Sequence, residues 1–476
     1  MKFIIPHDRF VRKSDFNKAA YSYALFSWTL FFGYCVAYQI SRIYLYRTRK
    51  QRIQNDRRGM NADDDDDDND IKDDKPDNNL PLNGLFNTYV RIPWLTNMIP
   101  VKHVLGVSLF FITNVIFCFF APFVLAPYVP EYEVPIPALM DRRCVYIGMV
   151  NWSFVIVLGL RNNIVTRMSG LTFEALVPFH RWVARIGLLE FIPHIVYRLW
   201  WAYDQHKIWY EAMTLDSEYM TGTLATFGFF LIFITAFEYI RRNHFELFYY
   251  THIIGFVIAM IGALTHEISC IYYFSPAIIL WIADRLLRSY RSWRIPSTLQ
   301  SIEPVSNNIM RIRFKYDGLG SFVPGQYVFM AFAHSATDKL GKKYRSWWQH
   351  YLNWYPMTVA EISKTIQWDE TTLLPRMRGT SDTSSATVYI KALGDFTKSL
   401  YNAASLGQVQ SFKVDGPYGP RLEYQDSHVM ACFALGVGVT PALALIQDCM
   451  NRRSAGSSTV LTSSIHLYWI IRHAGS

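Results

Sequence analysis

Four histidines stand at matched spacings in two apolar stretches of the sequence. His180 and His194 are 14 residues apart, and His252 and His266 repeat that interval. An α-helix has about 3.6 residues per turn, so both imidazoles of a stretch point from almost the same face, roughly 21 Å apart along the axis. Each stretch therefore presents two rings of a common metal-ligating side chain at two levels of one helix face.

The two stretches are expected to be the fourth and sixth of seven membrane spans, so they run in the same direction across the bilayer. His180 then faces His252 near the cytosolic side, and His194 faces His266 near the outer side. Two opposed imidazoles can fill both axial positions of a haem iron, so the spacing predicts two b-type haems stacked across the membrane. The alternative, ordinary core histidines bonded to their neighbours, is disfavoured by the repeated spacing.

The composition suits a chain that is partly embedded in a membrane. Of its 476 residues, 51% are hydrophobic and only 18% are charged, which is too apolar for an ordinary soluble enzyme. The net charge of +9 does not indicate nucleic acid, because Lys and Arg gather at the ends of apolar runs rather than in one stripe. The six cysteines are scattered without C-x-x-C spacing, which argues against a disulfide framework or a zinc site.

Seven apolar stretches are candidates to cross the bilayer as helices, for which roughly 20 residues are needed. The fourth is unusually polar, because it also carries Arg185, Glu190 and Arg198, and polar groups at membrane depth usually serve a function. Arg198 could pair with a haem propionate or snorkel to the interface. The seven stretches are residues 19–44, 101–125, 144–160, 180–202, 221–240, 245–266 and 271–287.

The charges that flank these spans predict one orientation. Lys and Arg follow the first, third, fifth and seventh spans, which the positive-inside rule places in the cytosol, although Arg142 and Arg143 lie on the outer side. Residues 1–18 are then extracytosolic and lack the apolar core of a signal peptide, so residues 19–46 form an uncleaved first transmembrane helix. We predict a multi-pass protein of the plasma membrane whose part after Arg288 is cytosolic.

A long cytosolic loop, residues 47–100, separates the first two spans. It contains six consecutive aspartates at residues 63–68. Such a run is typical of a solvated, disordered segment, which is what we predict here. Metal chelation is the less favoured alternative, because carboxylates on a flexible loop hold metal ions weakly.

After residue 294 the sequence changes to short β-type runs punctuated by Gly and Pro, which predicts a small antiparallel barrel. Residues 435–441 then read as a strand that opens onto a Gly-rich turn and a helix. A lone Gly-x-Gly is a weak signal, and its position after a barrel favours a nucleotide site over a plain turn. The predicted strands are residues 301–305, 310–316, 327–331, 386–392 and 410–414.

Taken with the four histidines, the motifs of this half resemble the ferric reductase and NADPH oxidase superfamily over about residues 100–473. The extra N-terminal span is more similar to fungal-type ferric reductases than to the six-span oxidases. The resemblance implies a polytopic α-helical haem domain (101–290), an antiparallel β-barrel FAD domain (295–425) and a partial α/β NADPH domain (426–476). The motifs are residues 322–327, 355–358, 391–397, 415–419 and 435–441.

The resemblance also implies individual flavin contacts. Residues 355–358 match the family motif H-P-F-T, so Pro356 and Thr358 are expected to lie against the isoalloxazine of FAD. Tyr355 stands where the family usually has His. Lys391 and Gly394 resemble a second flavin-contacting motif.

The same resemblance implies an NADPH site. Gly436, Gly438, Thr440 and Pro441 resemble the family's pyrophosphate turn, where backbone N–H groups and a helix N-terminus meet phosphate. The chain stops at Ser476, after the second expected strand of this domain, and the family's C-terminal Cys-Gly-Pro segment has no counterpart. We therefore expect a C-terminally truncated member, and whether it reduces its own flavin stays open.

Three functions follow as hypotheses. The first is an NADPH-dependent ferric-chelate reductase that acts in iron uptake, with extracellular Fe(III) or Cu(II) as acceptor and iron-uptake proteins as partners. The second is a superoxide-generating NADPH oxidase, against which the seventh span argues. The third is a truncated, non-catalytic haem protein that regulates a full-length reductase. All three place the chain in lipid, and none involves nucleic acid.

Overall fold

The computed structural model describes most of the chain after residue 135 and two helical stretches before it. The acidic run at residues 63–68 lies outside the described residues. The chain divides into a helical unit of residues 1–43, 65–170 and 174–283 and a second unit of residues 44–64, 171–173 and 284–476, which is rich in β-strands. The first and last long helices begin in the helical unit and continue into the second. The described residues are 13–60, 88–90, 99–119, 136–161, 164–214, 216–306, 308–334, 336–337, 343–344, 354–362, 368–369, 374–375, 385–407, 409–419, 422, 424–425, 427–454 and 460–471.

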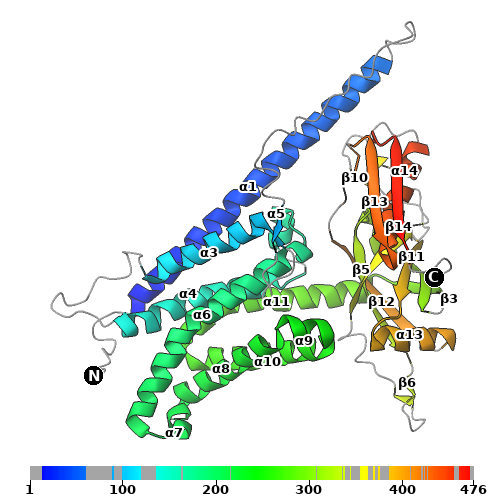
Figure 1. Cartoon of the computed structure of the whole chain (residues 1–476). Helices are drawn as coiled ribbons and strands as arrows, with labels where there is room; N and C mark the ends of the chain where they lie inside the picture. Colours follow the sequence, from blue (N-terminus) through cyan, green and yellow to red (C-terminus); the bar gives the residue numbers. More distant parts are fainter. Residues whose placement is uncertain are drawn as a thin grey trace. The chain divides into compact units, whose positions relative to one another are not determined.

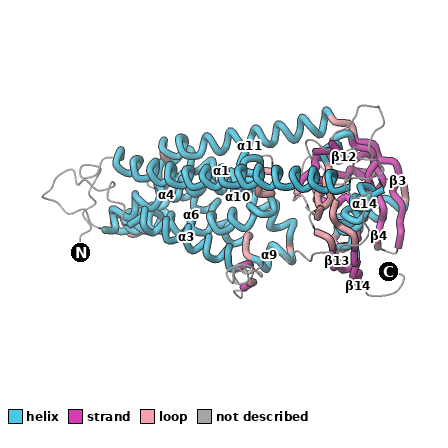
Figure 2. The backbone as a smooth tube through the Cα atoms, turned by 90° about the horizontal axis from the view of Figure 1, so that it is seen from above, coloured by secondary structure: helices cyan, strands magenta, loops and turns pink. Residues whose placement is uncertain are grey.

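The helical unit is a bundle of long helices joined by short ones (Figures 1 and 2). A pair of two-residue strands, β1 (Tyr89–Val90) and β2 (Ile99–Pro100), directly precedes α3. The helices are α1 (Lys13–Met60), α3 (Val101–Phe119), α4 (Ile136–Leu158), α5 (Ile164–Ser169), α6 (Phe173–His206), α7 (Trp209–Met213), α8 (Ser217–Thr235), α9 (Glu238–Asn243), α10 (Phe245–His266) and α11 (Ile268–Arg294).

Among the described residues, three helices are long and apolar enough to cross a membrane, namely α8, α10 and α11. A shorter apolar stretch, His103–Phe119, lies in α3. The bounds of α10 are those predicted for the sixth span. The total of seven spans stays a prediction.

Two of the predicted boundaries that the structure corrects lie at the end of α1 and at the end of α8. The helix α1 continues to Met60, so residues 47–60 are helical, although they were predicted to begin the disordered loop. These residues are rich in Arg, Lys and Gln, which favour helix. The fifth span, predicted over residues 221–240, is interrupted, because α8 ends at Thr235 and α9 begins at Glu238. Between them Phe237 takes a non-helical backbone, with φ −57° and ψ 144°.

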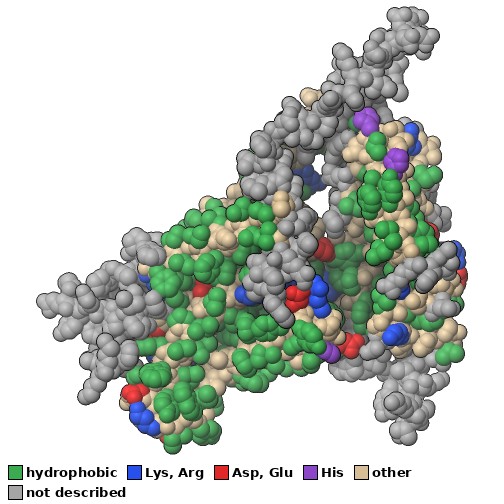
Figure 3. Space-filling model, viewed as in Figure 1, with side chains coloured by type: hydrophobic (Ala, Val, Ile, Leu, Met, Phe, Trp, Pro, Cys, Tyr) green, Lys and Arg blue, Asp and Glu red, His purple; other side chains and the backbone are tan. Residues whose placement is uncertain are grey.

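The helical unit turns apolar side chains outward, as lipid contact requires. Phe227 and Phe230 on α8 and Ile254 and Ile261 on α10 are all more than half exposed. Figure 3 shows hydrophobic side chains gathered over this unit on the visible face. Such a surface is costly in water and suits the hydrocarbon core of a bilayer, so the chain is an integral membrane protein.

The helices α8 and α10 pack antiparallel through glycines. A Cβ added at Gly228 would lie 2.4 Å from the backbone nitrogen of Ala259, and one at Gly262 would lie 2.4 Å from that of Ala225. Only a residue without a side chain fits such close backbone approach, which is typical of helix pairs in membranes. This contact fixes the position of α10 and therefore of the two histidines that it carries.

A buried polar network ties α1 to the rest of the bundle. The hydroxyl of Tyr23 on α1 donates to Oδ1 of Asn151 on α4 at 2.7 Å. The amide of Asn151 donates in turn to Asn114 on α3 and to the carboxylate of Glu190 on α6, each at 2.7 Å. All four side chains are buried. Polar groups that bond to one another across four helices hold the first helix in the bundle.

The β-rich unit contains a six-stranded antiparallel sheet in the order β12-β5-β8-β11-β4-β3. The hydroxyl of Ser297 on β3 donates to the carbonyl of Phe412 on β12 at 3.3 Å, so the two outermost strands approach each other and the sheet curls into a half-barrel, called the barrel below. The strands are β3 (Ser297–Ser306), β4 (Ile309–Tyr316), β5 (Tyr327–His334), β8 (Tyr355–Ile362), β11 (Ser385–Lys391) and β12 (Val409–Tyr418).

The barrel core follows from alternation along the strands. Ile312, Met330, Val359 and Val388 come from four neighbouring strands and are fully buried. The helix α13 (Asp395–Ser405) buries Leu400 against the same core. The remaining short elements are η2 (Asp317–Ser321), β6 (Ala336–Thr337) paired with β7 (Lys343–Tyr344), and β9 (Trp368–Asp369) paired with β10 (Leu374–Pro375).

All five predicted strands are present, in β3, β4, β5, β11 and β12, although β11 ends at Lys391, one residue before the predicted end. The strand β8 was not predicted, because Pro356 near its start interrupts the pattern of a strand. In the sheet β8 lies between β5 and β11.

The end of the described chain forms a β-α-β unit. The strand β13 (Val429–Leu435) leads through η3 (Gly436–Val439) and α14 (Thr440–Ser454) to β14 (Ser464–Ile470), which pairs with β13 in parallel. A helical crossover between parallel strands is the building block of nucleotide-binding α/β domains. The backbone N–H of Ile362 on β8 donates to Gln447 on α14 at 3.3 Å, which joins this unit to the barrel.

Candidate functional site

The structure brings the four histidines together in two pairs. The ring centroids of His180 and His252 are 6.3 Å apart, and those of His194 and His266 are 6.1 Å apart. Both pairs join α6 to α10 in the same sequence order, so these helices run in the same direction. The pairs are those that the 14-residue spacing predicts.

The separation of the rings suits one metal ion in each pair. Bonds from an imidazole nitrogen to a first-row metal ion are about 2.0 Å long, so two rings on opposite sides of one ion have centroids roughly 6 Å apart. Both pairs have this separation. The arrangement thus fits axial ligation of a haem iron at two levels of the bundle.

The second nitrogens of three of the rings have acceptors. Nδ1 of His180 donates to the carbonyl of Val155 at 2.9 Å, and Nδ1 of His266 donates to that of Glu218 at 2.8 Å. Nδ1 of His194 lies 2.5 Å from a carboxylate oxygen of Asp141. A proton on Nδ1 leaves Nε2 unprotonated, which is the form that ligates metals.

The fourth ring differs from the other three. Nδ1 of His252 is buried and has no hydrogen-bond partner among the described residues. A phenylalanine one turn earlier, Phe248, lies against the ring with centroids 5.3 Å apart. This ring is held by packing against its own helix rather than by an acceptor for Nδ1.

A glycine on α8 makes room for His266. A Cβ at Gly222 would lie 2.9 Å from Cε1 of the ring and 3.1 Å from Nδ1. The corresponding contact at the inner level is loose, since a Cβ at Gly159 would lie 3.6 Å from the ring of His180. The space for the ring of His266 therefore depends on a glycine at position 222, whereas the ring of His180 does not depend on a glycine at position 159.

An aromatic cluster fills the bundle next to the histidines. The ring centroids of Trp152 on α4 and Phe229 on α8 are 4.5 Å apart, and those of Phe191 on α6 and Phe229 are 5.3 Å apart. Phe191 falls in sequence between His180 and His194 on the same helix. These rings form a close-packed apolar region between α4, α6 and α8.

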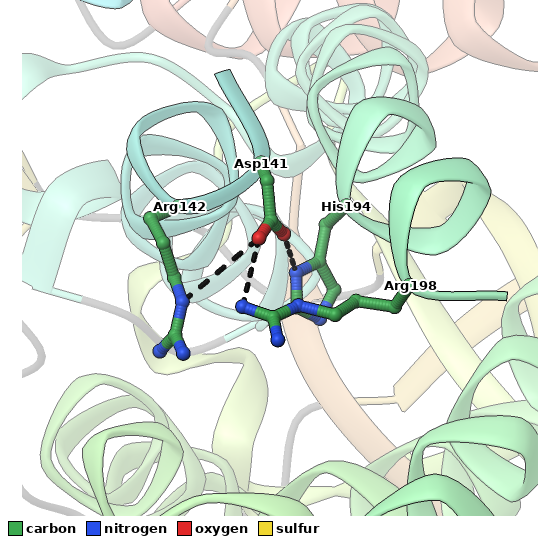
Figure 4. Close-up of polar contacts among 4 residues, drawn as sticks. All are labelled: Asp141, Arg142, His194 and Arg198. Atoms are coloured by element: carbon green, nitrogen blue, oxygen red, sulfur yellow. Dashed lines mark hydrogen bonds and ion pairs between the residues drawn. The ribbon is translucent and has the colours of Figure 1, made fainter. Parts of the chain in front are cut away.

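Asp141 binds three side chains near the outer histidine pair (Figure 4). One carboxylate oxygen accepts from Nδ1 of His194, and the other lies 2.8 Å from Nη2 of Arg198 and 3.9 Å from Nε of Arg142. The side chain of Asp141 is 2% exposed. The sequence left two roles open for Arg198, which were pairing with a haem propionate and reaching the membrane interface. In the structure Arg198 forms an ion pair with this buried carboxylate.

Sequence reasoning missed Asp141. The third predicted span begins at residue 144 and so leaves Asp141 outside it, whereas α4 begins at Ile136 and carries Asp141, Arg142 and Arg143 inside the helix. Arg143 is 1% exposed, so it is a bundle residue rather than a loop charge. The available signal was three charged residues within one turn of an apolar run, which is uncommon for an exposed loop boundary.

The two predicted flavin motifs lie close together in the barrel. Pro356 and Thr358 alternate with core residues of β8, so they share one face of the strand, with Pro356 exposed and Thr358 half-buried. Lys391 ends β11, the neighbour of β8, and Gly394 is the N-cap of α13. The ring of Tyr355 stacks on Phe396 of α13 at 4.0 Å, which joins the two motifs at one end of the barrel.

The predicted pyrophosphate turn lies at the carboxyl end of β13. Gly436 has a positive φ of 53°, and a Cβ at Gly436 or Gly438 would meet nothing within 4 Å. Thr440 and Pro441 begin α14, and the hydroxyl of Thr440 donates to the carbonyl of Val437 at 3.2 Å. Open space beside the backbone at a helix N-terminus suits a phosphate group.

The sequence matches two families of proteins. Residues 145–263 match "Ferric reductase like transmembrane component", a range that includes His180, His194 and His252. Residues 427–476 match "Ferric reductase NAD binding domain", which includes the Gly-rich turn.

Curated relatives agree with these matches. Ferric reduction oxidase 7 of Arabidopsis thaliana is 23% identical over 71% of this chain and 43% of its own length, and ferric reduction oxidase 5 is 26% identical over 64% and 40%. Mouse NADPH oxidase 1 is 23% identical over 54% of this chain and 46% of its own length. The chain thus spans less than half of these relatives. A ferredoxin NADP+ reductase from Neisseria gonorrhoeae, 11% identical, covers 38% of this chain and 59% of its own with a TM-score of 0.25, too low to support an argument.

Proposed function

Because the chain belongs to the ferric reductase and NADPH oxidase superfamily, we propose that it carries electrons from cytosolic NADPH across a membrane to an extracellular metal ion. FAD and two b-type haems are the cofactors of this proposal. Its main support is the pair of histidine contacts between α6 and α10, with ring centroids 6.3 and 6.1 Å apart.

His180 and His252 would hold the inner haem, and His194 and His266 the outer one. A haem with two imidazole ligands supplies one-electron transfer without an open position at iron, so the acceptor would be reduced at the porphyrin edge. The chain's own part is to fix the ligands, through the Nδ1 hydrogen bonds of three histidines and the glycine packing of α10 on α8. We extend the proposal to seven spans with the N-terminus outside.

The β-rich unit would hold the flavin and the nicotinamide nucleotide. Pro356 and Thr358 would lie against the flavin ring, with Lys391 and Gly394 at the same end of the barrel. The open backbone at the start of α14 would receive the phosphates of NADPH through its N–H groups. The residues proposed for that contact are Gly436, Gly438, Thr440 and Pro441.

The acceptor is proposed to be ferric or cupric ion in the service of iron uptake at the plasma membrane. The support is the names of the plant relatives, which are ferric reduction oxidases. Similarity to mouse NADPH oxidase 1 supports superoxide production as a second candidate. Cells that express the chain would distinguish the two functions. Reduction of a ferric chelate that persists in the presence of superoxide dismutase supports the first, and a signal that superoxide dismutase removes supports the second.

The cofactor proposal is tested with purified chain and a reduced-minus-oxidised absorbance spectrum. We expect a low-spin haem spectrum with two haems per polypeptide, and about one after His194→Ala. The control is His103→Ala, because His103 lies on α3 in the same unit, against Phe179, and belongs to neither of the two histidine pairs. A colourless wild-type protein, or two haems retained in the double variant His180→Ala/His194→Ala, would refute the ligand assignment.

A further inference from the structure

We propose that Asp141 is a positioning residue that makes the outer haem the more strongly reducing of the two. The inference rests on the proposed function, since it takes His194 and His266 as ligands of that haem. It concerns the electron-donating strength of His194, which Asp141 controls through the ring nitrogen that does not face the iron.

The four histidines differ in what their Nδ1 atoms meet. His180 and His266 donate to backbone carbonyls, which are neutral acceptors, and Nδ1 of His252 has no partner among the described residues. Among those described contacts, His194 alone has a carboxylate, at 2.5 Å. The outer pair therefore contains a charged acceptor, and the inner pair does not.

A carboxylate acts on a ligated imidazole more strongly than a carbonyl does. A hydrogen bond from Nδ1 to an anion draws the proton away from the ring and makes the imidazole a more basic ligand. A more basic ligand stabilises oxidised iron relative to reduced iron. The negative charge of the carboxylate favours the oxidised, more positive iron in the same direction, so the potential falls.

The surroundings of Asp141 preserve this effect. The side chain is 2% exposed, so its field is little screened by water. Arg198 holds the second carboxylate oxygen at 2.8 Å, and Arg142 lies 3.9 Å from it. The guanidinium of Arg198 orients the carboxylate toward His194 and partly offsets its charge, so each partner is expected to shift the potential with an opposite sign.

The functional consequence concerns the last transfer. A more negative potential at the outer level leaves more driving force for reduction of a weakly oxidising acceptor, such as ferric ion held by a strong chelator. Asp141 would thus favour difficult acceptors outside the membrane over fast equilibration between the two haems.

The test is a redox titration of the haem absorbance in the purified full chain. Wild-type protein should show two midpoint potentials. In Asp141→Asn the lower one should rise while the other stays in place, because the amide keeps the shape of the carboxylate and loses its charge. In Arg198→Gln the same potential should fall, because the carboxylate remains and its cation is gone. A loss of local order would shift both variants the same way.

A matched control is Asp284→Asn. Asp284 is also a buried helical carboxylate, 3% exposed, with Nε of Arg288 at 3.1 Å, and it lies on α11, which carries none of the four histidines. Both potentials should stay in place in this variant. If the Asn variant at position 141 does not retain two haems, Arg198→Gln carries the test.

Three results would overturn the inference: an unchanged or lower potential in Asp141→Asn, a rise in Arg198→Gln, or an equal shift of the same potential in Asp284→Asn. Two haems with such results would leave the proposed function standing. Wild-type protein without haem absorbance would refute the proposed function and this inference together.

Discussion

If the proposed haem ligands are right, the replacement Gly222→Ala should remove the outer haem and spare the inner one. The added Cβ would lie 2.9 Å from Cε1 of His266 and 3.1 Å from Nδ1. Carbon atoms in contact keep roughly 3.5–4.0 Å, so the ring has to move by about 0.6 Å or more. Bonds in a metal site hold their length within about 0.2 Å, so the displacement exceeds what ligation tolerates.

The fold itself should survive this change. Alanine is more favourable than glycine in a helix by about 1 kcal/mol, and position 222 lies inside α8. The displaced ring also strains the bond from Nδ1 of His266 to the carbonyl of Glu218, which holds it at 2.8 Å. The effect should therefore appear in the ligand and not in the helix.

The assay is haem content per polypeptide, with the absorbance spectrum of the reduced protein. We expect Gly222→Ala to retain about one haem of two with an unchanged elution volume in detergent. Gly159→Ala is the matched control, because its Cβ would lie an ordinary 3.6 Å from the ring of His180, and both haems should remain. Two haems with a wild-type spectrum in Gly222→Ala would refute the reasoning, as would loss of a haem in the control.

Three further predictions concern stability. Tyr23→Phe removes a buried hydroxyl and leaves the amide oxygen of Asn151 without that donor. The free energy of unfolding, measured by thermal unfolding, should therefore fall by about 1–3 kcal/mol. Tyr34→Phe, on the exposed side of α1, should have no effect. Gly262→Leu should abolish a monodisperse peak in detergent, because its Cβ would meet backbone at 2.4 Å, whereas Gly33→Leu, with open space around it, should elute normally. Burial raises the pKa of Tyr316 to about 12, so the folded state holds this proton more tightly than the unfolded chain. The stabilisation that the protonated Tyr316 contributes is complete below the ordinary pKa of 10.0 and is lost as the pH rises toward 12. Tyr316→Phe should therefore flatten the decline of stability over this pH range in denaturant titrations.

Local periodicity was sufficient to predict the histidine pairs. Residues 14 apart on a helix share a face whatever surrounds it, so the levels and the pairing followed once the two spans were taken as parallel. The barrel strands followed from the same kind of regularity, since their apolar residues alternate toward one core.

Features that depend on contacts between distant segments could not be predicted. Asp141 precedes His194 by 53 residues, and nothing near it in sequence indicates that contact. The strand β8 is stabilised by two neighbours despite Pro356, an example of tertiary context overriding local preference. The role of Gly222 likewise appears only when α8 lies against the ring of His266.

The network that joins Tyr23 to Asn151 and Glu190 has a practical consequence for shortened versions of this chain. Removing the first helix would turn a satisfied amide toward hydrocarbon and take away the hydroxyl that completes its bonding. Such a protein would expose a polar patch on its lipid-facing side, and a foreign helix or a detergent headgroup would tend to bind there. A version shortened from the N-terminus should therefore be cut before Ala19, so that the rest of α1 is kept.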